Sequence, residues 1–118
     1  MVTKAASPLH QGLVQALVEA FIGQRRYNVV AAAVEGYPDP EKVGRHEPDI
    51  IAKDDYGAWQ IGEAKTGDGD LDEQAKEQFL DFSKYSLHAI VPKSKEEDLR
   101  EFLRELGLIG RVTIWTRS

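Results

Sequence analysis

Three charged side chains in the middle of the chain have types and spacing that suit work on a phosphate. Asp49 and Glu63 each stand at the end of a short apolar segment, and Lys65 follows Glu63 by two residues. A hard divalent ion such as Mg²⁺ binds one or two protein carboxylates and keeps several waters, so two neighbouring acids would suffice. The Lys65 ammonium could hold a water or a phosphate oxygen beside them. The trio is a candidate site for cutting phosphodiester bonds, with Mg²⁺ as the expected cofactor and Mn²⁺ as a substitute.

The segment between the two acids predicts a hairpin that brings them together. Its turn is Asp-Tyr-Gly at 55–57, and glycine supplies the left-handed residue that closes a three-residue loop. The expected strand pairs are Asp54 with Ala58, Lys53 with Trp59, and Ile51 with Ile61. Counting back along both strands puts Asp49 directly opposite Glu63, and Lys65 on the same face because side chains alternate. Two opposed carboxylates repel unless a cation lies between them.

These residues resemble the signature of the PD-(D/E)XK nuclease superfamily, which stands here as Pro48-Asp49-Ile50 and Glu63-Ala64-Lys65. The resemblance implies a restriction-endonuclease-like fold and a metal held by Asp49, Glu63 and the carbonyl of Ala64. It also implies that Lys65 positions the attacking water. Within the superfamily, the chain is most similar to the archaeal Holliday-junction resolvases, because it is small and carries an acid on its first helix.

That acid is Glu19. Ser7 and Pro8 predict a helix start, and apolar residues spaced by four predict a helix to Ile22 that stops at Gly23. Glu19 lies at the edge of the apolar face, beside small residues. Two interpretations stay open: a metal ligand, as the resemblance implies, or an ordinary acid at the flank of the helix.

Gln78 falls within the apolar stripe of a second helix, expected from about Leu71 to Lys84. A buried amide needs hydrogen-bond partners, so Gln78 is either an internal structural residue or faces a polar site. It also resembles the glutamine of a Gln-x-x-x-Tyr motif of some superfamily members, with Phe82 in place of the tyrosine. We predict that Gln78 lies near Lys65 on the catalytic face.

The charges indicate where nucleic acid would bind. The chain has 15 basic and 20 acidic residues and a net charge of -5, which argues against nonspecific coating of nucleic acid. Many of the acids follow the hairpin, whereas acids and bases are equal in number over residues 1–47. The candidate phosphate contacts are Arg25, Arg26, Arg45 and His46. The last two end a loop close to Asp49, and as surface residues they would also need no function.

The whole pattern predicts one α/β domain over residues 1–118, with a central mixed β-sheet flanked by helices in the order α-β-β-β-α-β-α-β. Besides the hairpin, strands are expected at 27–34, 87–91 and 111–116. A third helix is expected to begin at a capping box of Ser94 with Glu97 and to stop at Gly107.

The composition excludes several classes. There are no cysteines, so disulfides, thiolate zinc sites and cysteine nucleophiles are absent. No run approaches the length of a membrane span, and the first residues lack the pattern of a secretory signal, so we expect a cytoplasmic protein.

Two functions compete on this pattern. The first is a Mg²⁺-dependent endonuclease, acting on DNA as its expected partner. The second is a noncatalytic module that keeps the nuclease fold and binds nucleic acid or protein, which the acidic balance makes credible. For the nuclease we expect a homodimer, because paired cuts need two sites related by a two-fold axis.

Overall fold

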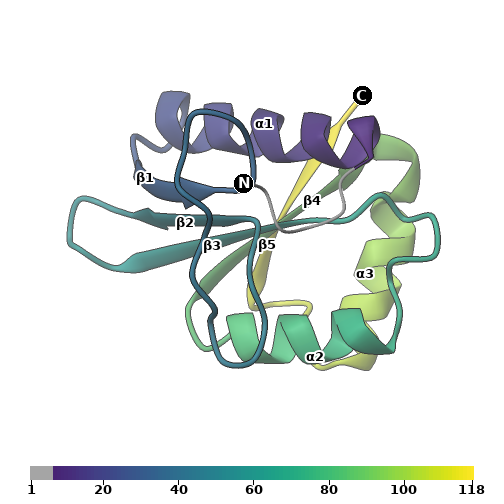
Figure 1. Ribbon diagram of the computed structural model, residues 1–118. Helices are drawn as coiled ribbons and strands as arrows, with labels where there is room; N and C mark the ends of the chain where they lie inside the picture. The colour runs from purple at the N-terminus through teal and green to yellow at the C-terminus, as the bar shows by residue number, and fades with distance from the viewer. Residues whose placement is uncertain (1–6) are drawn as a thin grey trace.

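The computed structural model describes residues 7–118 as a mixed sheet with helices on both of its faces (Figure 1). The elements are, in order, α1 (Pro8–Gly23), β1 (Asn28–Ala32), β2 (Ile50–Lys53), β3 (Trp59–Ala64), α2 (Glu73–Phe82), β4 (Ser86–Pro92), a 3₁₀ turn η1 (Lys93–Lys95), α3 (Glu96–Glu105) and β5 (Val112–Arg117). The five strands lie in the sheet in sequence order. β1, β2 and β3 pair antiparallel, and β3, β4 and β5 pair parallel. The predicted α/β class with a mixed sheet is confirmed.

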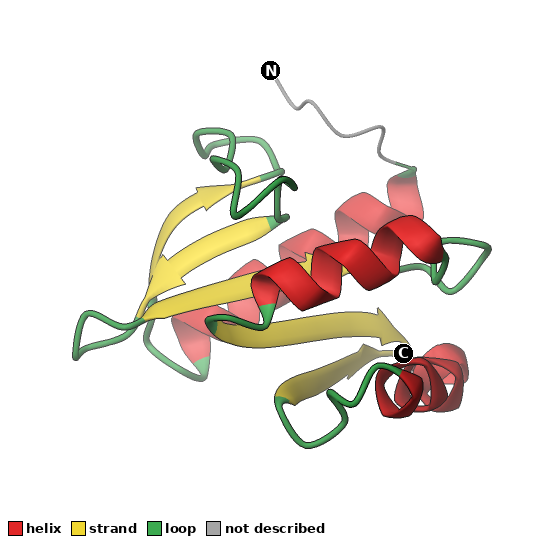
Figure 2. Cartoon of the chain, turned by 90° about the horizontal axis from the view of Figure 1, so that it is seen from below, coloured by secondary structure: helices red, strands yellow, loops and turns green. Residues whose placement is uncertain are grey.

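Each face of the sheet carries its own apolar core. On one face α1 buries a stripe of five residues: Leu13, Val14, Leu17, Val18 and Phe21. On the other face α2 and α3 pack against β3, β4 and β5 through a cluster that includes Phe79, Phe82, Leu99 and Leu103. Viewed from below, the strands fan out in a twisted sheet between the helices (Figure 2). Within residues 7–118, no helix is long and apolar enough to cross a membrane.

The hairpin of β2 and β3 has the register that the turn predicts. Ile51 lies opposite Ile61 and Lys53 opposite Trp59. Beyond them, the backbone N–H of Asp54 donates to the carbonyl oxygen of Ala58 at 3.0 Å. Gly57 has φ 82°, the left-handed conformation that a glycine adopts without steric cost.

Two helix starts differ from the sequence prediction. α3 begins at Glu96, after the 3₁₀ turn, and no side chain caps it, so the capping box at Ser94 is wrong. The reason is that Ser94 lies inside the turn rather than before the first helical residue. α2 begins at Glu73 rather than Leu71, because the Asp72 side chain accepts a hydrogen bond from the N–H of Ala75 and sets the cap there.

Candidate active site

The two acids of the hairpin are in direct contact at the end of β2 and β3. Both side chains are buried: Asp49 is 0% exposed and Glu63 is 1% exposed. The backbone N–H of Asp49 donates to Glu63 Oε1 at 3.1 Å, and the N–H of Ala64 donates to Asp49 Oδ2 at 2.8 Å. Each carboxylate is therefore held by the backbone of the opposite strand, which fixes the position of both groups.

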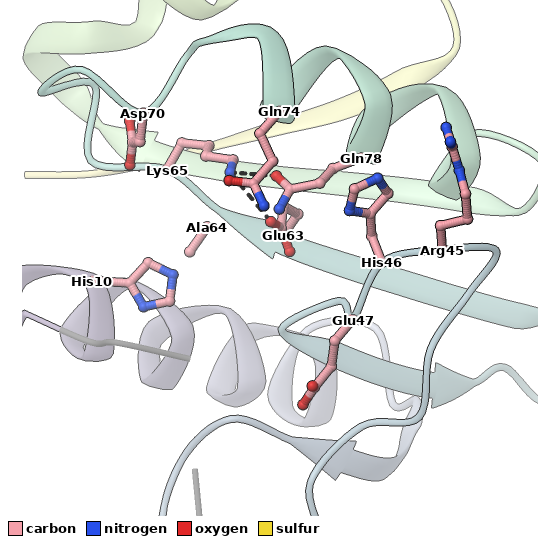
Figure 3. A pocket seen from close by; sticks show the side chains of 10 residues that line it. All are labelled: His10, Arg45, His46, Glu47, Glu63, Ala64, Lys65, Asp70, Gln74 and Gln78. Atoms are coloured by element: carbon pink, nitrogen blue, oxygen red, sulfur yellow. Dashed lines mark hydrogen bonds and ion pairs between the residues drawn. The ribbon is translucent and has the colours of Figure 1, made fainter. Parts of the chain in front are cut away.

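Two nitrogen-bearing side chains, Lys65 and His10, flank this pair. Lys65 Nζ lies 3.4 Å from Glu63 Oε2 and donates to Gln78 Oε1 at 2.6 Å. His10 Nε2, from the first turn of α1, lies 3.3 Å from Asp49 Oδ2. Figure 3 shows the Lys65 ammonium reaching towards both the Glu63 and the Gln78 side chains, with His10 on the opposite side of the pocket. The Lys65 ammonium thus offsets part of the repulsion expected between two opposed acids.

The cluster faces a cavity of about 460 Å³ between α1, α2 and the loop before β2. Six residues singled out from the sequence contribute to its wall: Arg45, His46, Glu63, Ala64, Lys65 and Gln78. The position predicted for Gln78, near Lys65 on the face with the acids, is confirmed. Asp49 is fully buried and is not among the residues that line the cavity, so its carboxylate lies behind those of its neighbours in the cluster.

Asp81 of α2 pins the loop that carries Arg45 and His46. The backbone N–H of Arg45 donates to Asp81 Oδ2 at 3.2 Å, and His46 Nε2 lies 4.0 Å from the same oxygen. Gly44 has φ 67°, and a Cβ there would lie 2.8 Å from the Asp81 carboxylate. Only glycine lets the loop approach α2 so closely, and this approach holds the two basic residues over the cavity.

Three predicted site residues lie elsewhere. Glu19 is exposed, and its carboxylate accepts a hydrogen bond from Gln15 on the same helix. It follows His10 by nine residues, and at about 100° per residue that places it on the opposite side of α1 from the cavity. The structure therefore does not bring Glu19 to the acid pair, and a role for it as a metal ligand there is not supported.

Arg25 and Arg26 follow the far end of α1. Roughly 20 Å of helix separates that end from His10, at 1.5 Å per residue. The Arg25 guanidinium lies 5.1 Å from the centre of the Trp115 ring, away from the cavity. These two arginines do not join Arg45 and His46 in one phosphate-binding surface.

The residue that the sequence analysis missed is His10. It stands one turn before Leu13 and Val14, so it continues the buried stripe of α1. A polar residue within an apolar stripe was the signal that singled out Gln78, and the same signal was present at position 10. Asp70 and Gln74 also line the cavity. Asp70 closes the loop after β3, because its carboxylate accepts from the N–H groups of Thr66 and Gly67.

A second buried polar cluster lies on the opposite face of the sheet. His88 of β4 is 2% exposed, its Nε2 lies 2.8 Å from Gln60 Oε1, and its Nδ1 accepts from Trp115 Nε1 at 3.1 Å. These two contacts fix a neutral ring with the proton on Nε2. Burial, with a smaller contribution from the nearby Arg25 charge, lowers the pKa of His88 to about 4.

The acid pair suits a hard divalent ion by its chemistry. Among residues 7–118, no group of three His, Asp or Glu side chains converges as a ready metal cage. Mg²⁺ does not need such a cage, since one or two carboxylates with waters complete its shell. Asp49 and Glu63 supply hard oxygens, and Gln78 would remain as a partner of Lys65 if a bound cation took its place beside Glu63.

Comparison with models of protein families, with curated proteins and with solved structures gave no match.

Proposed function

We propose that this protein is a metal-dependent endonuclease that hydrolyses phosphodiester bonds in DNA, with the restriction-endonuclease-like fold of the PD-(D/E)XK superfamily. The observation that carries the proposal is the convergence of Asp49, Glu63 and Lys65 at the end of one hairpin, beside an open cavity. Two buried carboxylates and a lysine 3.4 Å from one of them are unusual in a core unless chemistry needs them.

The chain's own residues would act at three points. Lys65 would hold the attacking water and stabilise the charge that develops on the phosphate, because its ammonium lies at the cavity wall. Gln78 would keep that ammonium in place through its 2.6 Å hydrogen bond. Arg45 and His46 would hold the flanking phosphates, since the clamped loop carries both over the cavity.

Asp49 and Glu63, with the carbonyl of Ala64, would hold Mg²⁺ or Mn²⁺. Such an ion supplies two effects when bound, namely polarisation of the phosphate and a lower pKa for a bound water. The hydrogen bonds from the backbone to both carboxylates keep them oriented for that purpose.

The test is an incubation of the protein with linear duplex, single-stranded and four-way-junction DNA, and with matching RNA forms, with and without Mg²⁺ or Mn²⁺. We expect ion-dependent cutting of at least one DNA form, and its loss in Lys65→Ala. If no form is cut with either ion, the proposal fails and the noncatalytic binding module takes its place.

Gln78→Leu is a finer variant for the same assay. Leucine suits the apolar stripe of α2, so the fold should be retained, while Lys65 loses its amide partner. We expect cutting to slow by about ten- to a hundredfold, the usual effect of misplacing a catalytic group. Cutting at the wild-type rate would reduce Gln78 to a structural residue.

We further propose that the active form is a homodimer, in which two cavities related by a two-fold axis cut both strands. Sedimentation with and without a short duplex measures this directly. A monomer mass at micromolar concentration, unchanged by DNA, would contradict it.

A further inference from the structure

A row of one half-buried lysine and two exposed aromatic residues crosses the sheet at the start of β3. Lys53 of β2 pairs with Trp59 of β3. On the other side, Gln60 pairs with Ser86, so Tyr85 stands beside Trp59 just before β4 begins. Trp59 is 40% exposed and Tyr85 is 46% exposed. Large aromatic rings are seldom left open to water side by side, so this row is a candidate binding surface.

The row borders a groove of about 270 Å³. Ile51 and Ile61 form its floor, and Trp59 and Tyr85 stand at its edge. Its remaining side is the segment Glu41–Val43. That segment continues into Arg45 and His46, which line the cavity of the acid pair. The groove and the cavity are therefore bordered by one loop.

The groove also lies on the same face of β3 as the catalytic pair. Side chains two apart share a face, so Trp59, Ile61 and Glu63 point to the same side. Four residues along a strand span roughly 13 Å. A nucleic-acid strand with its cleaved phosphate at Glu63 would reach Trp59 within a few nucleotides.

The charges of the groove favour a nucleic acid over an apolar protein segment. Lys53 Nζ lies over the Trp59 ring, 4.4 Å from its centre, which holds the ring and puts a cation against one of its faces. Lys42 lines the groove and Glu41 is the single acid among the lining residues. Aromatic rings beside lysines are the combination with which proteins stack bases and hold the attached phosphates.

We propose that Trp59 and Tyr85 stack an unpaired base of the substrate strand, with Lys53 and Lys42 holding its phosphates. The inference rests on the proposed nuclease function and narrows it: the substrate carries unpaired nucleotides next to the cut. Duplex DNA without such nucleotides would leave the rings unused, because its bases stack on one another.

The first test measures binding without cutting. Labelled oligonucleotides of about eight nucleotides are titrated by fluorescence anisotropy against Glu63→Gln and against Glu63→Gln with Trp59→Leu. Loss of one base–aromatic stack should weaken binding of the single strand by about ten- to a hundredfold. Trp59→Phe keeps a ring and should stay within about fivefold. A blunt duplex should bind all of these variants alike.

Tyr56→Ala is the matched control, because Tyr56 is an aromatic residue at the tip of the same hairpin, 97% exposed and outside the groove. It should bind like the parent. Circular dichroism checks the fold of each variant, and if Trp59→Leu does not fold, Tyr85→Leu takes its place in the titration.

The second test separates this inference from the proposed function. The active protein and Trp59→Leu are compared on a blunt duplex and on duplexes with short 5′ or 3′ unpaired ends. If both proteins cut all forms alike, the stacking inference is overturned and the nuclease stands. If the wild type cuts nothing but Trp59 still governs binding of single strands, the nuclease fails and the binding surface stands. The stacking inference is overturned if Trp59→Leu binds the single strand as tightly as its parent. It is also overturned if the substitution changes only the self-association of the protein.

Discussion

The sheet carries buried polar residues on both faces, and the two clusters differ in every respect that matters for chemistry. On the face of α2, the cluster of Asp49, Glu63 and Lys65 is charged and faces a cavity. On the face of α1, the cluster of Gln60 and His88 is neutral and closed. Both interrupt an apolar core, so burial alone does not identify a functional site.

The hydrogen bonds explain the difference. His88 uses both ring nitrogens on protein partners, so the ring gains nothing from a ligand. Lys65 shares its ammonium between a carboxylate and an amide at the wall of a cavity, where substrate atoms could replace either contact. We infer that the cluster of Gln60 and His88 serves stability, and that the cluster of Asp49, Glu63 and Lys65 serves the proposed reaction.

The largest expected effect is the loss of cutting in Glu63→Gln. The amide oxygen can still accept from the Asp49 N–H, so the free energy of unfolding should change by no more than about 1 kcal/mol. The cutting rate should fall at least about a thousandfold, or about 4 kcal/mol, because a proposed metal ligand is gone. Single-turnover cutting with Mg²⁺ and thermal melting measure the two quantities. If Glu63→Gln is strongly destabilised but its folded fraction cuts at the wild-type rate, Glu63 serves stability and not the reaction.

His88→Leu should give the opposite result. It leaves the buried Gln60 carbonyl and the half-buried Trp115 N–H without their partner, and a fully buried group so left costs about 1 to 3 kcal/mol. We expect the free energy of unfolding to fall by about 3 kcal/mol, while cutting per folded molecule stays within about twofold. Urea denaturation checks it. His46→Leu, on the loop, is the stability control and should cost less than about 1 kcal/mol.

Acid should destabilise the wild type through the same histidine. The pKa of His88 in the folded protein is about 4, below its ordinary 6.5, so the unfolded chain takes up a proton first as the pH falls. Stability is therefore intact above the ordinary pKa and declines from there towards pH 4. Between about pH 7 and pH 5 this histidine should cost about 2 kcal/mol. Urea curves at both pH values measure it, and His88→Leu should lose that part of the pH dependence.

The sequence predicted the parts of the site that local rules control. A three-residue turn fixed the register of β2 with β3, and the register put Asp49 against Glu63. The stripe of α2 then placed Gln78 beside Lys65. Each step needs only alternation along a strand or periodicity along a helix.

Those local rules do not predict which elements distant in the sequence contact one another. Periodicity put Glu19 at the flank of α1, but which flank faces the site depends on how α1 crosses the sheet. Its first turn, with His10, meets the strand ends instead. Arg25 and Arg26 were chosen by charge alone, and charge carries no information about which end of a helix meets the cavity.

The smallest effect we predict is a difference in DNA binding between two arginine variants, one beside the cavity and one beyond the far end of α1. Arg45 is exposed beside the cavity and pairs with Glu77 at 3.1 Å, whereas Arg26 lies past the far end of α1. Arg45→Gln should weaken DNA binding by about three- to tenfold and make the slope of log K against log salt shallower by about 0.9, the value for one phosphate contact on duplex DNA. Arg26→Gln, the matched control, should change neither quantity. Glu77→Gln should act in the opposite direction to Arg45→Gln, because it frees the guanidinium for phosphate. If Arg45→Gln and Arg26→Gln weaken DNA binding equally, the charge of the whole surface governs binding. The loop that carries Arg45 and His46 would then not be a specific part of the binding site.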